Sequence, residues 1–390
     1  MIDYGRIING TVKDIKPSGI RKFFDVANTM ENVISLGVGE PDFRTPWQVR
    51  KVGISTLERG LTRYTSNKGL SPLRGEIARY LKRKYELDYE PEHEILVTVG
   101  GSEAIDAAIR TITVGGDEII IPQPSYVCYE PMVRLAGGVP VIITTKEENE
   151  FKLTPEELRA AITEKTKAVI LPYPCNPTGA IMGREDLIAI EEVLRGTNIL
   201  VISDEIYSEL TFGTERHISC AAIPGMKERT VLINGFSKTF SMTGWRMGYA
   251  CGPCEILKEM TKIHQFAIMC APTTSQYAAI EALKSCDGDV ERMLEEYDER
   301  RRIIVHGFNK LGLTCIEPKG AFYAFPSIRK TGMTSEEFCE KLLHSKGVAL
   351  VPGTAFGSGG EGYVRASYCY SFDHIREALT RIGEFLDECK

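Results

Sequence analysis

Short apolar runs alternate with amphipathic segments along most of this chain. The amphipathic segments have the spacing of helices, for example Ser102–Ile112, Thr154–Ala161 and Arg184–Leu194. Continuous apolar strands between such helices are typical of a mostly parallel sheet that helices cover on both faces. The pattern therefore predicts an α/β fold. The expected strands span residues 94–99, 118–121, 140–143, 168–171, 199–203, 230–233 and 247–250.

The pattern changes near residue 285. Residues 287–311 predict one long helix with charges of both signs, and the rest of the chain mixes short strands with helices. We therefore expect a large α/β domain over residues 46–285 and a smaller α+β domain over residues 286–390. Residues 1–45 are expected to pack beside the small domain. The expected elements of that domain span residues 321–325, 335–344, 348–351, 363–368 and 375–386.

Composition and charge narrow the functional classes. The 390 residues carry a net charge of −6 without a block of like charge, so neither a nucleic acid nor an anionic membrane is an expected partner. No apolar run approaches the ~18 residues of a membrane span, and the first residues lack the apolar stretch of a signal peptide. We therefore expect a cytoplasmic protein.

The eleven cysteines are scattered and mostly lie in apolar runs, which is typical of reduced structural thiols. Cys251 and Cys254 have the CxxC spacing of a redox site or of half a zinc site. No second CxxC occurs, the six histidines show no ligand spacing, and Pro253 is placed to begin a helix. We therefore expect no metal site and no redox role for this pair.

One lysine carries the most specific chemistry in the chain. Lys238 lies between Ser237 and Thr239, and Arg246 follows in a segment rich in glycine and apolar residues. A lysine that forms a Schiff base must be partly desolvated, and an arginine at a fixed offset can bind a phosphate. An isolated Lys/Arg pair more often lies on a solvated surface, but the apolar context argues against that alternative. A lysine-bound cofactor with a phosphate, such as pyridoxal phosphate (PLP), fits the segment.

Further polar residues follow predicted strands, where open α/β sheets bind ligands. Gly101 and Ser102 open a helix, and such a turn either binds phosphate or is a glycine turn with a serine N-cap. Tyr126 either stacks on a planar ring or is a buried structural tyrosine. Asn176 lies in a proline-rich turn, which is rigid enough to hold a donor but also occurs without function.

A carboxylate follows the strand predicted at 199–203. Burial of the Asp204 carboxylate at this position would cost free energy unless a cationic group pairs with it. A protonated pyridine nitrogen is such a group. The alternative is a helix N-cap. Tyr207 lies three residues further on, so a helical turn would place it on the same side as Asp204.

Taken in chain order, these elements resemble the class I/II aminotransferases, the aspartate aminotransferase-like PLP enzymes of fold type I. The resemblance covers nearly the whole chain and is closest to the branch of aminotransferase A, N-acetyl-diaminopimelate and aromatic aminotransferases. It implies a mostly parallel sheet with helices on both faces, plus a smaller α+β domain. The matching segments are Ser35–Phe43, Tyr64–Thr65 with Gly69 and Leu73–Arg74, Gly100–Ser102, Asn176–Gly179, Ser203–Tyr207, Ser237–Thr239, Gly320–Tyr323 and Tyr363–Ser367.

The resemblance implies roles for residues around the cofactor ring. Lys238 matches the Schiff-base lysine, which also moves a proton during catalysis, and Asp204 matches the carboxylate that keeps the pyridine nitrogen protonated. Asn176 and Tyr207 match donors to the ring hydroxyl oxygen. Tyr126 matches the aromatic side chain that stacks on the ring.

The resemblance also implies anion sites. Tyr64 matches a tyrosine that reaches the phosphate of the neighbouring subunit, which implies a homodimer with shared active sites. Arg365 matches the arginine that binds the substrate carboxylate, with Gly39 and Asn176 beside it. The residues at or next to the family's phosphate site are Gly101, Ser102, Ser237 and Arg246.

Two features concern affinity and specificity. Many relatives have serine three residues before the lysine, where this chain has Gly235, so one phosphate hydrogen bond is expected to be missing. Arg21, Lys22, Phe23 and Phe24 lie in a segment that the family folds over the active site. The two cations would favour acidic substrates, and the two rings would favour aromatic ones.

The resulting hypothesis is an aminotransferase that moves an amino group from an L-amino acid to 2-oxoglutarate by a ping-pong mechanism. Aspartate, aromatic and N-acetyl-diaminopimelate-like donors stay open. A PLP-dependent C–S lyase of the same fold is the alternative, since fold alone does not determine the reaction. A non-catalytic regulator with an added DNA-binding domain fits poorly, because the chain lacks the length and the basic charge for one.

Overall fold

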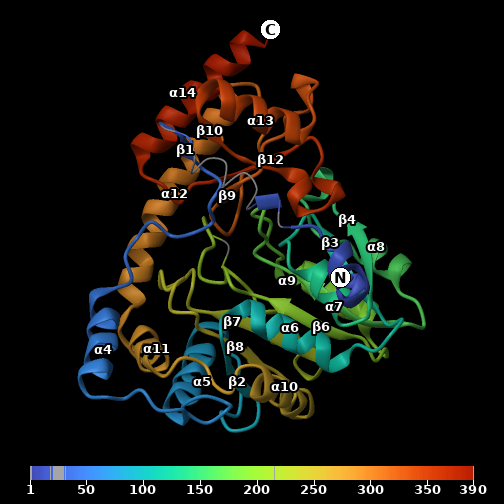
Figure 1. Ribbon diagram of the computed structural model, residues 1–390, viewed down its shortest axis with the longest axis vertical. Coiled ribbons are helices and arrows are strands. Elements are labelled where there is room, and N and C mark those ends of the chain that lie inside the picture. The colour runs from blue at the N-terminus through green and yellow to red at the C-terminus, as the bar shows by residue number, and fades with distance from the viewer. Residues whose placement is uncertain (1, 18, 21–29, 31, 215, 390) are drawn as a thin grey trace.

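The computed structural model describes residues 2–17, 19–20, 30, 32–214 and 216–389. Its largest sheet has seven strands in the order β2-β8-β7-β6-β5-β3-β4 (Figure 1). The strands from β7 to β4 pair in parallel, and β8 is antiparallel to both neighbours. Each predicted apolar run forms one strand, so the mostly parallel sheet is confirmed. The strands are β2 (Ile95–Thr98), β3 (Glu118–Gln123), β4 (Val139–Thr144), β5 (Thr166–Leu171), β6 (Leu200–Asp204), β7 (Thr230–Gly235) and β8 (Gly248–Cys251).

Helices cover both faces of this sheet, because successive strand residues are apolar and point to opposite sides. Along β5, Ala168 and Ile170 belong to one hydrophobic cluster, whereas Val169 and Leu171 belong to another. The first cluster also contains side chains of α6 (Gly101–Ile112), α7 (Tyr129–Leu135) and α10 (Cys254–Ala267). The second contains side chains of α8 (Pro155–Ala161) and α9 (Arg184–Leu194).

A long helix, α12 (Asp287–Lys310), connects the large sheet to a smaller group of elements at the C-terminal end (Figure 1). It begins beside α11 (Thr273–Ser285), which packs on α4 (Trp47–Glu58) and α5 (Ser71–Tyr85), and it ends against β9 and α14. The smaller group has a sheet of order β11-β12-β9, whose pairs are antiparallel, and a parallel pair of β1 with β10.

This α+β group confirms the predicted fold class, and the domain boundaries stay predictions. Its elements are β1 (Ile34–Ser35), β9 (Tyr323–Ala324), α13 (Ser335–Lys346), β10 (Val348–Ala349), β11 (Val351–Pro352), β12 (Val364–Ser367) and α14 (Phe372–Glu388). Short 3₁₀ helices in the large and small parts of the molecule span Glu147–Asn149, Cys220–Ala222, Lys227–Arg229, Arg329–Thr331, Gly353–Phe356 and Ser358–Gly360.

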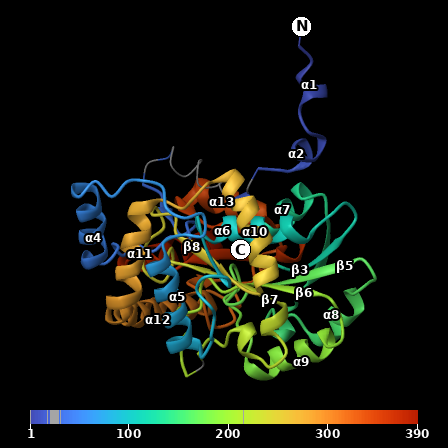
Figure 2. The same ribbon diagram turned by 90° about the horizontal axis from the view of Figure 1, so that it is seen from below.

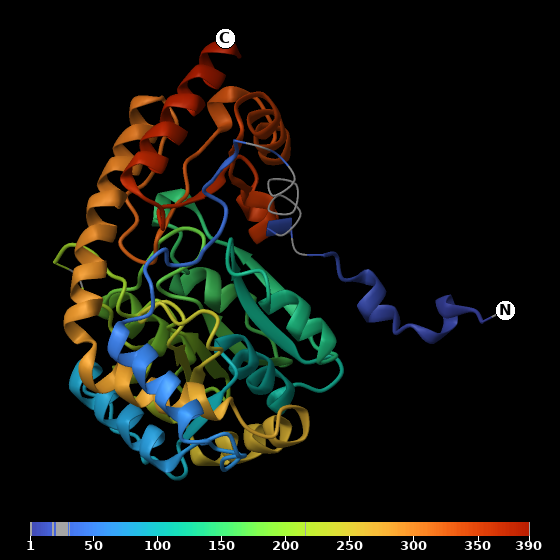
Figure 3. The same ribbon diagram turned by 60° about the vertical axis from the view of Figure 1, so that its left-hand side comes forward.

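The N-terminal arm, residues 2–16, passes beside α7 and then extends away from the body of the molecule (Figures 2 and 3). It contains two short helices, α1 (Tyr4–Ile7) and α2 (Gly10–Asp14), whose N-termini are capped by the side chains of Asp3 and Asn9. Its exposed apolar side chains are Ile2, Tyr4, Ile7, Ile8 and Val12. The arm therefore presents apolar surface that its own chain leaves uncovered.

Candidate active site

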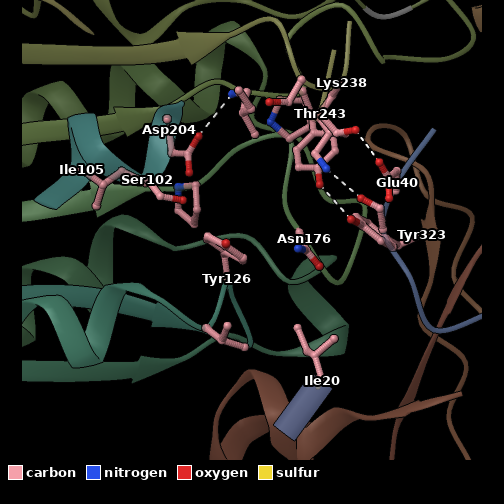
Figure 4. Close-up of a pocket in the computed structure, with 18 of the residues that line it drawn as sticks. Ile20, Glu40, Ser102, Ile105, Tyr126, Asn176, Asp204, Lys238, Thr243 and Tyr323 are labelled. Atoms are coloured by element: carbon pink, nitrogen blue, oxygen red, sulfur yellow. Dashed lines mark hydrogen bonds between the residues drawn. The ribbon is translucent and has the colours of Figure 1, made fainter. Parts of the chain in front are cut away.

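One cavity of about 570 Å³ lies where the carboxyl ends of the parallel strands meet the smaller group of elements (Figure 4). Parallel strands bring the residues that follow them to one edge of a sheet. Of the twelve predicted site residues, all except Tyr64 line this cavity. They are Gly39, Gly101, Ser102, Tyr126, Asn176, Asp204, Tyr207, Ser237, Lys238, Arg246 and Arg365.

Lys238 lies in the turn that follows β7 and points into the cavity (Figure 4). Its Nζ donates to the Gly39 carbonyl oxygen over 2.7 Å. Burial lowers the pKa of this amine to about 8, and the positive charges of Arg365 and Arg246 act in the same direction. A lysine with this pKa has an accessible neutral amine near neutral pH, as a nucleophile or a proton carrier requires.

Asp204 ends β6 and is buried beneath the cavity. Its Oδ2 accepts from the Tyr129 hydroxyl over 2.7 Å, and its Oδ1 accepts from the backbone N–H of Ile206 over 3.2 Å. Burial raises the pKa of Asp204, and these two hydrogen bonds oppose the rise. The carboxylate lines the cavity, so a cationic group of a ligand can meet it there.

The turn between β2 and α6 forms one end of the cavity. Gly100 has φ = 80°, in the left-handed region that favours glycine, and Gly101 begins α6. Arg246 reaches the turn through a hydrogen bond from Nη2 to the Val99 carbonyl oxygen (3.5 Å), while its Nη1 donates to the carbonyl oxygen of Thr243 in its own segment (3.2 Å). A helix N-terminus beside a guanidinium is an anion site.

Three glycines allow this turn to pack tightly. Gly235 and Gly248 pair across β7 and β8, and a Cβ on Gly248 would lie 2.5 Å from the Gly100 carbonyl carbon. A Cβ on Gly235 would lie 2.9 Å from the Met247 carbonyl oxygen and 3.1 Å from the Gly248 Cα. The sequence suggested that Gly235 lacks a useful hydroxyl. The backbone geometry instead leaves no room for any side chain at that position.

Arg365 on β12 is almost fully buried. Its Nη1 donates to Asn176 Oδ1 over 2.9 Å and its Nη2 donates to the Gly37 carbonyl oxygen over 2.5 Å, while its Nε is buried without a hydrogen-bond partner. The guanidinium lies over the rings of Tyr323 (4.4 Å) and Phe356 (4.8 Å). Within the described part of the chain, no carboxylate forms an ion pair with it, so it is a buried cation suited to an anionic ligand.

Two tyrosines bridge the large sheet and β9. The Tyr207 and Tyr323 hydroxyls lie 2.8 Å apart, and burial raises the pKa of both phenols. Asn176 lies in the turn after β5, where the Tyr173–Pro174 and Asn176–Pro177 peptide bonds are cis, which the sequence could not settle. Tyr126 packs edge-to-face on Tyr129, with ring centroids 5.9 Å apart.

The sequence interpretation missed four polar residues of the cavity. Tyr129 lies three positions after Tyr126, but nothing in the sequence linked its hydroxyl to Asp204. Tyr323 lay in a matching segment without a role, although its ring lies under Arg365. Glu40 and Thr243 hydrogen-bond to each other across the cavity mouth and come from segments about 200 residues apart (Figure 4).

Two predicted features lie elsewhere. Tyr64 is 83% exposed and does not line the cavity of its own chain. Arg21, Lys22, Phe23 and Phe24 lie outside the described residues. Cys251 is buried in β8, Cys254 is exposed, and neither forms a disulfide. Over the residues that the structure describes, no cluster of three or more His, Cys, Asp or Glu side chains could bind a metal ion, and no helix could span a membrane.

The cavity brings together a lysine, a buried carboxylate and Arg246 from the carboxyl-end side of the parallel strands and Arg365 from β12, a set typical of an enzyme active site. The family model for aminotransferase class I and II matches residues 31–382. The chain belongs to that family and is an aminotransferase.

Individual relatives agree with this assignment. The chain is 53% identical to a "putative aminotransferase YugH" of Bacillus subtilis, over 96% of this chain and 97% of that protein. It is 45% identical to an aspartate aminotransferase of Pyrococcus abyssi, over 96% and 97%. An aspartate aminotransferase structure from Thermus thermophilus with maleate superposes with a TM-score of 0.92 at 36% identity, covering 97% of this chain and 99% of that one.

Proposed function

We propose that this aminotransferase uses PLP to move an amino group from an L-amino acid to 2-oxoglutarate. One observation carries the proposal. A single cavity contains a lysine with a lowered pKa, a buried carboxylate and two arginines that have no carboxylate partner among the described residues. This set complements a ligand with an aldehyde, a ring cation, a phosphate and a neighbouring carboxylate.

The ring end of PLP fits the residues around Lys238. Asp204 would pair with a protonated pyridine nitrogen, because a buried carboxylate that faces a cavity is stabilised by a cation. Tyr126 would stack on the ring face. Asn176 and Tyr207 would donate to the ring hydroxyl oxygen, since both carry donors that line the cavity.

The phosphate end fits the turn that begins α6. Gly101 and Ser102 offer the free N–H groups of a helix N-terminus, and Arg246 adds a guanidinium beside them. Ser237 also lines the cavity and would add a hydroxyl donor. Arg246 has φ = 53°, a conformation that costs an arginine about 1–3 kcal/mol and is characteristic of functional sites.

PLP, when bound, withdraws electrons from the substrate carbon that bears the amino group and holds that group between the two half-reactions. The protein's part is positioning and proton transfer. Lys238 Nζ would take the proton from that carbon of the donor and return a proton to the corresponding carbon of the acceptor. A pKa of about 8 suits both directions at neutral pH.

Arg365 would bind the carboxylate that every donor and acceptor shares. Its fixed guanidinium, held by Asn176 and Gly37, would orient that carboxylate through two hydrogen bonds. The proposal does not assign the side chain of the amino donor. Relatives are named for aspartate, for aromatic amino acids and for N-acetyl-LL-diaminopimelate, and each remains a candidate donor.

We also infer a cytoplasmic homodimer with shared active sites. Tyr64 is exposed, and its loop is held beside another exposed segment by a hydrogen bond from Asn67 to the Met269 carbonyl oxygen. The exposed apolar side chains near these segments and on the N-terminal arm would be buried by a second copy. They include Ile2, Tyr4, Ile7, Trp47, Phe266 and Met269.

An absorbance scan tests the proposed reaction. Purified protein should show the visible absorbance of lysine-bound PLP, lose it on addition of a donor amino acid, and regain it on addition of 2-oxoglutarate. Aspartate, phenylalanine and N-acetyl-diaminopimelate, added separately, would rank the donors. Absence of any visible band after PLP is added would overturn the cofactor proposal. Release of pyruvate, ammonia and sulfide from separately added L-cysteine would instead identify a C–S lyase.

A further inference from the structure

A buried histidine–glutamate pair lies directly behind the turn that the proposed phosphate site uses. His264 lies on α10 and its side chain is fully buried, whereas Glu103 lies in the first turn of α6 and is 15% exposed. His264 Nδ1 and Glu103 Oε1 are 2.5 Å apart. Because an ionised carboxylate can only accept, the imidazole Nδ1–H is the donor.

The same carboxylate holds the backbone of the turn. Glu103 Oε2 accepts from the Val99 N–H over 2.5 Å, and Arg246 Nη2 donates to the Val99 carbonyl oxygen over 3.5 Å. The backbone N–H and the backbone carbonyl of Val99 are therefore each hydrogen-bonded to a charged side chain. Gly101 and Ser102, which line the cavity, follow within three residues, so the position of Val99 sets where their N–H groups point.

A histidine is an unusual residue type at position 264 of α10. The buried side chains Leu257, Met260 and His264 follow helical spacing and pack toward α6. An apolar residue would complete this stripe, and His264 Nε2 is buried without a hydrogen-bond partner in the described structure. A buried unsatisfied nitrogen is costly, so the position is better explained by what Nδ1 does for Glu103 than by packing.

We propose that His264 is a positioning residue for the phosphate site, acting through Glu103 on the turn from Val99 to Ser102. It touches neither the cavity nor a substrate. It orients the Glu103 carboxylate, which fixes the backbone that presents N–H donors to the phosphate. The proposal rests on the proposed PLP cofactor and concerns only the phosphate end of that cofactor.

Comparison of PLP with pyridoxal, which lacks the phosphate, isolates this role. Full-length protein freed of cofactor would be titrated with each compound, and the dissociation constants measured by absorbance. His264→Leu should weaken PLP binding about tenfold, as expected for a lost charge-assisted hydrogen bond, and change pyridoxal binding less than twofold. His264→Asn should restore PLP binding to within about threefold, because its amide nitrogen can replace Nδ1 as donor.

Two further variants provide controls. Glu103→Ala should weaken PLP binding to a similar degree. The His264→Leu/Glu103→Ala double variant should bind PLP no more weakly than the worse single variant, because both substitutions break the same chain of hydrogen bonds from His264 through Glu103 to Val99. Lys262→Ala removes an exposed ion pair with Glu259 on the same helix and should change neither constant.

The outcomes separate this inference from the proposed function. Equal loss of PLP and pyridoxal affinity in His264→Leu, or no loss of either, would overturn the role of His264. A wild-type protein that binds neither compound would overturn the cofactor proposal itself. The melting temperature of cofactor-free His264→Leu should stay within a few degrees of wild type, because leucine completes the apolar stripe.

Discussion

At the scale of single residues, burial moves the pKa values of two groups that line the same cavity in opposite directions. It lowers the pKa of the Lys238 amine and raises the pKa of the Asp204 carboxyl, because a low-dielectric surrounding disfavours either charge. Each charge is stabilised when an opposite charge arrives. A ligand that brings charges of both signs, as the proposed PLP does, would therefore be stabilised in this cavity.

Removal of the lysine should stabilise the protein in the absence of cofactor. Lys238 has a folded pKa of about 8 against an unfolded value of ~10.4, so the unfolded chain binds more protons between these values. The destabilising contribution is full below about pH 8 and vanishes above ~10.4. Lys238→Met should raise the free energy of unfolding at pH 7 by about 1–3 kcal/mol, after allowance for partial exposure of the side chain.

Urea unfolding of cofactor-free Lys238→Met and wild type at pH 7 and pH 10 measures this contribution. The difference in free energy of unfolding between the two proteins should be smaller at the higher pH. A difference that is absent at pH 7, or that grows with pH, would contradict the buried, charged state assigned to the amine. The variant should also lack transaminase activity and the visible absorbance of lysine-bound PLP.

The hydrogen bond from Tyr129 should lower the pKa of the Asp204 carboxyl. This 2.7 Å hydrogen bond opposes the effect of burial, so Tyr129→Phe should raise the pKa of Asp204 further. The acid limb of the pH–activity profile should then move to higher pH, and PLP affinity should fall about tenfold or more. The matched control is Tyr80→Phe, which removes a 2.6 Å tyrosine–carboxylate hydrogen bond to Glu209 outside the cavity. An unmoved acid limb in Tyr129→Phe would refute this role.

At the scale of elements, the site depends on how closely β7, β8 and the turn before α6 approach one another. Gly235 and Gly248 let the backbones of β7, β8 and the turn meet closely, and Gly100 leaves room for the Arg246 guanidinium. Hydrogen bonds to Val99 then hold the turn from both sides. The proposed phosphate site would therefore be formed mainly by packed backbone, with side chains added around it.

Gly235→Ser, which would introduce the serine that the family resemblance implies at this position, should not strengthen cofactor binding. The added Cβ would meet the Met247 carbonyl oxygen at 2.9 Å, so the strands must separate. Overpacking of this kind costs about 1–3 kcal/mol of stability. Urea unfolding and PLP titration should show a less stable protein with unchanged or weaker affinity. Gly115→Ser, at a glycine with open space around it, is the control. Tighter PLP binding in Gly235→Ser would contradict the packing argument.

At the scale of the whole molecule, the cavity of one chain lacks Tyr64, while that tyrosine is exposed beside other apolar side chains. The N-terminal arm likewise extends from the body with its apolar residues uncovered (Figure 3). A second copy of the chain would account for both features.

Mixing two inactive variants tests whether the copies share sites. In a heterodimer of Lys238→Ala and Tyr64→Ala chains, one site has both residues and the other has neither. Random exchange should therefore restore about a quarter of wild-type activity at limiting PLP. Lys238→Ala mixed with Lys238→Ala/Tyr64→Ala should restore none. Sedimentation should show dimers, and a monomer that retains full activity would disprove shared sites.

Local sequence determined most of this architecture. Continuous apolar runs placed all seven strands of the large sheet, because a strand buried on both faces excludes polar residues. Strand ends in a parallel sheet converge, so Asp204, Asn176 and Lys238 could be assigned to one cavity, and the family resemblance supplied Arg365 from the distant β12.

Only the tertiary structure decided which groups touch across long sequence distances. The bonds from Tyr129 to Asp204, from Lys238 to Gly39 and from His264 to Glu103 join elements 75, 199 and 161 residues apart. The reason is physical. The local order of polar and apolar side chains determines which residues are buried and which segments form strands. Hydrogen bonds between remote elements, close backbone approaches and pKa shifts arise only when packing fixes the distances between those elements.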